Sequence, residues 1–136
     1  MPIVLIAKTE EDYAAWVTEQ KGAAAAAADA ATATLTMDEL MAQGEAAYNK
    51  TCAACHQANG QGIPGVFPAI AGSAIAKGDV AGHLDIVLNG KDGTAMQAFG
   101  EQLGAVDLAA VITYQRNAFG NDTGDMVQPA DVAAAK

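Results

Sequence analysis

The sequence of 136 residues predicts a small all-α domain. Three segments have the spacing of apolar residues that is typical of helices, at about residues 37–49, 79–89 and 106–118. The stretches between them, 59–72 and 90–100, are rich in glycine and favour ordered loops. A short motif, Cys52-Ala-Ala-Cys55-His56, directly follows the first of these helices. We therefore expect the helices and loops to be arranged around that motif.

The cysteine–histidine motif has the spacing of a covalent haem attachment site. Residues three and four positions apart share one face of a helix, so Cys52, Cys55 and His56 can all meet one flat ligand. Two thioether bonds would hold the porphyrin, and the histidine would bind the iron. We therefore expect one covalently attached haem c as the cofactor.

Other readings of the motif explain less of it. A thioredoxin-like pair would follow a buried strand, whereas residues 40–50 read as helix. A zinc site needs four well-spaced ligands, and His83 is the only candidate beyond the motif. A disulfide or thiol–disulfide redox pair leaves His56 unexplained, and it is the non-haem alternative.

Composition and charge narrow the function further. Hydrophobic residues make up 51% of the chain, but much of this is alanine and only seven residues are aromatic, so the side chains make a thin core. A bound haem would supply the large apolar body that such a core lacks. The net charge of −9 argues against nucleic acid and anionic membrane surfaces as partners. The sequence contains no run of 18 apolar residues, so we expect neither a membrane span nor a membrane contact in this chain.

The N-terminal third is expected to lie outside the haem domain. Residues 1–7 are β-branched and apolar enough for a strand, and a helix is expected from Glu10 to about Gln20. The alanine-rich residues 22–34 have no stripe of larger apolar residues and are predicted to be a linker. A lone strand needs a partner, and no export signal is visible although haem is attached outside the bacterial cytoplasm. Both points favour a fragment of a longer protein.

The haem domain is predicted to span residues 35–120. Thr36 and Glu39 form a capping-box pattern at the start of its first helix. Gly44 in the middle of that helix suggests that another backbone comes close, and Val111 and Tyr114 of the last helix are expected to lie across it. Residues 121–136 show no pattern and are predicted to be a disordered tail.

The second axial ligand of the iron is expected to be Met96. This residue lies on a glycine-flanked loop 40 positions after His56, and such a loop can fold over the second face of a haem. The rival His83 falls on the solvent side of its helix by periodicity, and the other methionines are interpreted as core or tail residues: Met37, Met41 and Met126. With both axial positions filled, the iron can only pass one electron. An open iron position would instead indicate a gas sensor or a peroxidase-like enzyme.

Four stretches resemble a known family, the class I cytochrome c domain fused to the C-terminus of subunit II in bacterial caa-type cytochrome c oxidases. They are Cys52-x-x-Cys55-His56, Gly62-Ile-Pro-Gly-Val-Phe-Pro68-Ala-Ile-Ala-Gly-Ser73, Gly93-Thr-Ala-Met96-Gln-Ala-Phe-Gly100 and Val111-Ile-Thr-Tyr114-Gln-Arg-Asn117. The resemblance implies a class I cytochrome c fold. It also implies that a carbonyl neighbouring Pro68 accepts the Nδ1 proton of His56.

The same resemblance extends to the N-terminus. Residues 1–21 resemble the end of that subunit's dinuclear-copper domain, with Met1 in the place of a copper-ligating methionine. The other copper ligands are absent, so no copper site is expected in this chain. The domain would not be catalytic by itself but part of an oxygen-reducing oxidase, on the periplasmic side of the bacterial inner membrane.

The expected partners follow from this role. Electrons would come from a periplasmic donor and pass to the copper domain of the same polypeptide, beside oxidase subunit I. Residues 35–120 hold four basic and eight acidic residues, so we expect a mainly apolar docking surface near Ala95, Gln97 and Ala98. The alternative is a free periplasmic cytochrome c or the cytochrome subunit of a dehydrogenase.

Overall fold

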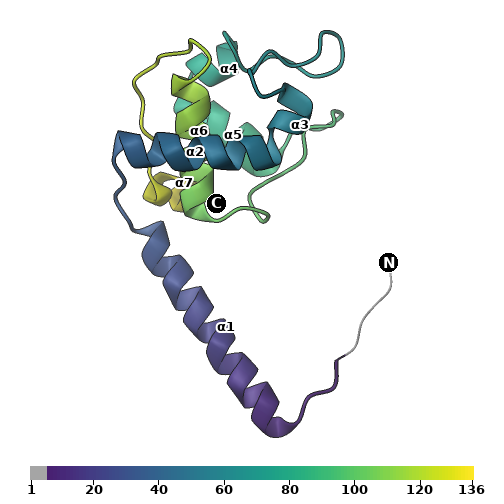
Figure 1. The fold of residues 1–136 in the computed structure, drawn as a ribbon, viewed down its shortest axis with the longest axis vertical. Coiled ribbons are helices and arrows are strands. Elements are labelled where there is room, and N and C mark those ends of the chain that lie inside the picture. The colour runs from purple at the N-terminus through teal and green to yellow at the C-terminus, as the bar shows by residue number, and fades with distance from the viewer. Residues whose placement is uncertain (1–5) are drawn as a thin grey trace.

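The computed structural model describes residues 6–136, and these form seven helices and no strand (Figure 1). The helices are α1 (Glu10–Ala31), α2 (Met37–Thr51), α3 (Ala53–His56), α4 (Ala74–Lys77), α5 (Val80–Asn89), α6 (Ala105–Asn117) and α7 (Pro129–Ala135). The all-α prediction is confirmed. Most of the strand predicted at 1–7, and the comparison of Met1 with a copper ligand, fall outside the described residues. Residues 6–9 have no regular structure.

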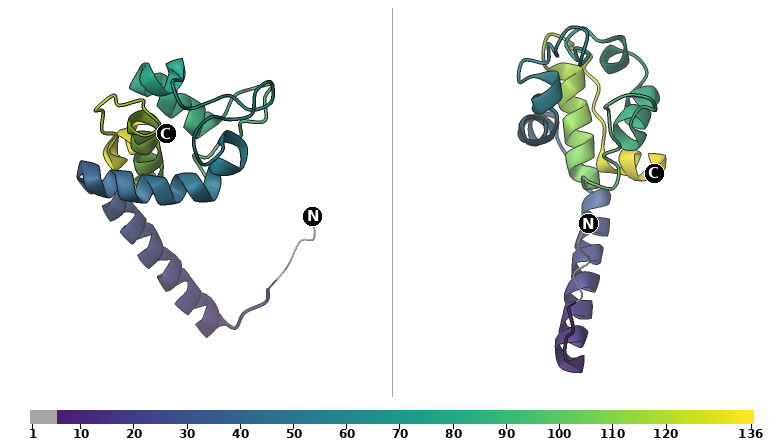
Figure 2. Two further views of the ribbon diagram at one scale, coloured as in Figure 1. Left: turned by 45° about the horizontal axis from the view of Figure 1, so that its top comes forward. Right: turned by 90° about the vertical axis from the view of Figure 1, so that its right-hand side faces the viewer.

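Helix α1 is a single rod that leads away from the rest of the molecule (Figures 1 and 2). Thr9 caps it by accepting a hydrogen bond from the Asp12 backbone N–H. The expected helix ended near Gln20, but the alanine-rich residues continue it to Ala31 because alanine has the highest helix propensity. Only its C-terminal end reaches α6 and α7 (Figure 1). No helix in the described part of the chain is long and apolar enough to cross a membrane.

Helices α2 and α6 cross closely, as Gly44 predicted. The capping box of Thr36 and Glu39 starts α2 where expected. A Cβ atom at Gly44 would lie 2.2 Å from the carbonyl oxygen of Ala110 and 2.6 Å from the Cβ of Tyr114. The closest neighbour is therefore Ala110 rather than Val111. Only glycine lets the two backbones approach this far.

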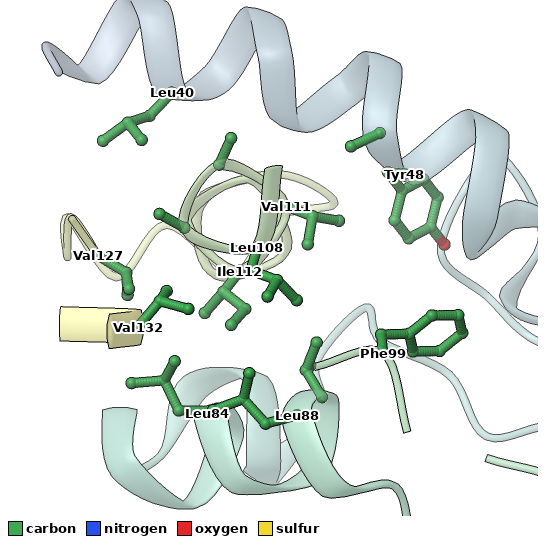
Figure 3. Packing of buried hydrophobic residues seen from close by; sticks show 14 of the residues in the cluster. Leu40, Tyr48, Leu84, Leu88, Phe99, Leu108, Val111, Ile112, Val127 and Val132 are labelled. Carbon is green, nitrogen blue, oxygen red and sulfur yellow. The ribbon is translucent and has the colours of Figure 1, made fainter. Parts of the chain in front are cut away.

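Helix α6 runs through the centre of the core (Figure 3). Its residues from Leu108 to Ile112 are almost completely buried. Helix α5 lies on one side of it and buries the apolar face that its periodicity predicted: Leu84, Val87 and Leu88. Helix α2 covers another side with Leu40 and Tyr48 (Figure 3). This scaffold leaves the segments between α3 and α4 and between α5 and α6 free to form loops.

The C-terminal segment, residues 121–136, is packed and ordered, so the prediction of a disordered tail is wrong. Val127 and Val132 are completely buried against the core (Figure 3). The Thr113 side chain accepts from the Val127 N–H at 2.9 Å. The Gln128 amide bonds both the N–H and the carbonyl of Leu35, at 2.9 Å each. So few buried residues in so short a segment leave no periodic signal in the sequence.

Candidate haem site

The cysteine–histidine motif forms a tight turn at the end of α2. Cys52 ends α2, and its carbonyl accepts hydrogen bonds from the N–H groups of Cys55 and His56 at 3.1 and 2.9 Å. The short helix α3 that results brings both cysteine side chains and the histidine ring to one cavity. The thiols of Cys52 and Cys55 are free. Burial, followed by the nearby Cys55, raises the pKa of Cys52 to about 11, so this group stays a thiol at neutral pH.

The end of α3 is fixed by the core. Gln57 adopts a left-handed backbone, with φ of 63°. The Tyr48 hydroxyl donates to the Gln57 carbonyl at 2.7 Å, and the Gly62 N–H donates to the His56 carbonyl at 2.9 Å. Tyr48 is itself completely buried. The α2–α6 crossing therefore sets the position of the histidine.

The loop after α3 holds the His56 ring. The ring Nδ1 lies 2.8 Å from the carbonyl oxygen of Pro68, to which it donates. The acceptor is the carbonyl of Pro68 itself. This contact leaves the Nε2 lone pair available for a metal. The loop passes close to itself at Gly62, whose φ is +63°. A Cβ atom there would lie 2.4 Å from the Phe67 carbonyl oxygen, so the loop needs glycine at this position.

A cavity of about 290 Å³ joins these groups to the second loop. Cys52, Cys55, His56 and Met96 all line it. Most of the remaining wall is apolar and includes Val66, Phe67, Ile70, Ile86, Val87 and Phe99. Such a wall suits the flat hydrophobic body of a porphyrin.

Met96 is presented by a loop that is tied to α5. The Lys91 N–H donates to the Met96 carbonyl at 3.0 Å, and the Met96 N–H donates to the Thr94 hydroxyl at 3.2 Å. Further along, the N–H of Phe99 bonds the Val87 carbonyl. The other three candidate methionines, Met37, Met41 and Met126, do not line the cavity.

His83 is buried, so the prediction that it faces solvent is wrong. Its exposed fraction is 4%, and it lines the same cavity. Its Nε2 lies 2.8 Å from Gln115 Oε1, and its Nδ1 is buried without a partner among the described residues. Burial lowers the pKa of His83 to about 4. The apolar pattern of α5 could not predict that His83 is buried, because its hydrogen-bond partner, Gln115, belongs to α6.

Sequence reasoning missed Gln115 and Lys91, which also line the cavity. Gln115 follows Val111 by four positions and so lies on the same face of α6. Because its side chain is polar, the pattern of apolar residues did not predict that Gln115 is buried. Lys91 gave no signal beyond its nearness to Met96.

The residues present fit a covalently attached haem. Two free thiols, an imidazole with a free Nε2 and a thioether sulfur share one mostly apolar cavity. Thioether attachment uses such a cysteine pair, and haem iron accepts imidazole and thioether ligands.

Comparison with known proteins agrees with this donor set. The chain is 28% identical over 95 residues to the cytochrome c subunits of quinone alcohol dehydrogenases from Gluconacetobacter polyoxogenes and Komagataeibacter europaeus. These matches cover 62% of this chain but only 20% of each relative. Residues 39–114 match the family described as cytochrome c oxidase, cbb3-type, subunit III. The chain therefore belongs to this family and is a c-type cytochrome electron-transfer domain.

Proposed function

We propose that this domain carries single electrons through one haem c that is ligated by His56 and Met96. The observation that carries the proposal is the cavity in which Cys52, Cys55, His56 and Met96 meet. When bound, the haem supplies a one-electron couple whose iron has no position left for a substrate. The domain then acts as a carrier and not as a catalyst.

Different residues of the chain hold different parts of the haem. Cys52 and Cys55 anchor the porphyrin, while the Pro68 carbonyl orients the His56 ring. The hydrogen bonds at Lys91 and Thr94 hold the loop that carries Met96. The apolar wall excludes water, which favours the less charged ferrous state.

The axial assignment is tested by Met96→Ala. This change should abolish the sulfur-to-iron charge-transfer band of the oxidised protein, lower the reduction potential and let carbon monoxide bind readily to the ferrous form. Met126→Ala is the matched control, because Met126 is 51% exposed and lies away from the cavity. Ready binding of carbon monoxide to the unaltered protein would contradict the assignment and favour a gas sensor or peroxidase-like enzyme.

For the partner, we propose the dinuclear-copper centre of a caa-type haem–copper oxidase, with electrons arriving from a periplasmic donor. Two points support an oxidase. The matched family is named for an oxidase subunit, and the residues quoted above resemble the domain fused to oxidase subunit II. In that setting the domain works on the periplasmic side of the inner membrane, beside subunit I.

A dehydrogenase cytochrome is the second candidate, because both similar curated relatives are cytochrome c subunits of quinone alcohol dehydrogenases. Stopped-flow mixing separates the two. The ferrous domain is mixed with a soluble dinuclear-copper domain, and the ferric domain with a reduced quinoprotein dehydrogenase. The oxidase role predicts that only the first reaction is fast at micromolar protein. Fast transfer from the dehydrogenase alone would overturn the oxidase role and leave the carrier function intact.

A further inference from the structure

The wall of the haem cavity contains one buried polar pair. His83 of α5 and Gln115 of α6 are each only 4% exposed, and both line the cavity. Their side chains meet at 2.8 Å, between His83 Nε2 and Gln115 Oε1. Burying two polar side chains is costly unless their hydrogen-bonding groups are used. The question is therefore where the remaining groups of the pair find partners.

The hydrogen bond within the pair sets the direction of both side chains. Gln115 Oε1 is an acceptor, so His83 Nε2 carries the proton and donates it. The Gln115 amide nitrogen then has two N–H groups and donates to no partner among the described residues. Unlike His83 Nδ1, this nitrogen is not fully buried. Gln115 is otherwise buried and lines the cavity, so a group bound in the cavity is the partner within reach of these N–H groups.

A bound haem has one kind of strong acceptor for such a donor. The porphyrin body is apolar, and its only ionised groups are the two propionate carboxylates. An N–H group covered by the apolar ring would lose its hydrogen bonds to water without gaining a partner, which is destabilising. We propose that Gln115 donates a hydrogen bond to a haem propionate and that His83 is the positioning residue that holds the Gln115 amide in place. The inference rests on the haem attachment proposed above.

This arrangement has a consequence for the pH dependence of the reduction potential. A hydrogen bond to the ionised carboxylate keeps the pKa of the propionate low in both oxidation states. Reduction removes a positive charge from the iron and so raises the pKa of a nearby carboxylate. With both values held low, the potential should be flat from pH 5 to 8. Without the donor, the potential should fall as pH rises through part of this range.

The experiment measures the potential from pH 5 to 8 for the haem-loaded protein and three variants. Gln115→Leu should create the slope, and His83→Leu should create a weaker one, because it frees the amide but leaves it in the cavity. Gln43→Leu alters an exposed glutamine of α2 and should match the unaltered protein. The other ionisable residues that line the cavity are Cys52, Cys55, His56 and Lys91, and all four proteins share them. Since the low pKa keeps His83 neutral above pH 5, its removal takes away no charge.

A second measurement needs no variant. In the NMR spectrum of the reduced, diamagnetic protein, the side-chain amide of Gln115 should exchange slowly with water and one of its protons should be shifted by hydrogen bonding. A fast-exchanging Gln115 amide, or a flat potential in Gln115→Leu, would overturn the proposal. If the unaltered protein holds no covalent haem, the carrier function itself fails. Covalent haem with a fast-exchanging Gln115 amide removes only the propionate contact.

Discussion

The two ends of the described chain look alike in sequence and behave differently in the structure. The N-terminal arm, residues 6–31, and the C-terminal segment, residues 121–136, are both rich in alanine, and apart from Tyr13, Trp16 and Val17 in the arm neither has large apolar residues at helical spacing. The arm forms α1, which projects from the molecule (Figure 2). The C-terminal segment folds back and buries Val127, Pro129 and Val132. Similar composition therefore does not decide whether a terminal segment belongs to the core.

The difference between the two segments shows that α1 and α7 are stabilised in different ways. Helix α1 has 22 residues, and its run of alanines gives it enough propensity to need little support. Helix α7 has seven residues, too few to be stable alone, so its contacts with the core hold it in place. At about 1.5 Å per residue, α1 is a spacer about 33 Å long rather than a flexible coil.

The largest effect is expected from deleting the C-terminal segment. Without residues 121–136 the core loses three fully buried side chains, the bonds of Thr113 to Val127, and the Asn121 contacts to Ile70 and Gly72. We expect a loss of cooperative unfolding in thermal melts followed by circular dichroism. Deleting residues 1–31 should leave the melting temperature and the haem spectrum nearly unchanged. Equal losses from the two deletions would show that the arm is part of the domain.

Two glycines sharpen the same comparison inside helices. Gly44→Val drives a branched side chain into the Ala110 carbonyl and should cost about 1–3 kcal/mol from overpacking alone. Gly22 of α1 has no neighbouring atom within 4 Å of an added Cβ, so Gly22→Val should leave the stability of the haem domain unchanged. Urea titration of both variants measures this. An unchanged midpoint for Gly44→Val would contradict the close crossing.

Two valines give a smaller contrast. Val132 is completely buried, and Val132→Ala should lower the free energy of unfolding by about 2 kcal/mol through lost burial and a small cavity. Val17 of the arm is only partly buried, and Val17→Ala should change it by less than about 0.5 kcal/mol. Chemical denaturation at one temperature compares the pair. Matching losses would mean that the arm packs as tightly as α7.

Part of the fold and of the cavity could be predicted from the sequence. It predicted α2, α5 and α6 to within two residues, because each has a cap or a regular apolar face. It predicted that Met96 lies on a glycine-flanked loop, and this loop lines the cavity. It failed where a buried polar side chain depends on a distant partner: His83 needs Gln115, and Asn121 bonds the carbonyls of Ile70 and Gln115. Periodicity counts apolar residues only, so it cannot detect a contact made between polar groups 32 positions apart.

The smallest expected effect is a pH-dependent one, at the base of the C-terminal segment. Arg116 is 2% exposed and donates through Nε to Asp125 at 3.0 Å and through Nη2 to the Gly78 carbonyl at 2.8 Å. The Arg116 hydrogen bond holds the pKa of the Asp125 carboxyl below its ordinary value. A lowered folded-state pKa stabilises the protein above the unfolded pKa, and this contribution is lost as pH falls through the folded-state pKa.

Asp125→Asn should therefore melt below the unaltered protein at neutral pH, and the two melting temperatures should converge as the solution is made more acidic than about pH 4. Asp29→Asn, on the exposed arm, should show no such difference at any pH. A gap for Asp125→Asn that stays constant down to acid pH would mean that the segment is held by its apolar contacts alone.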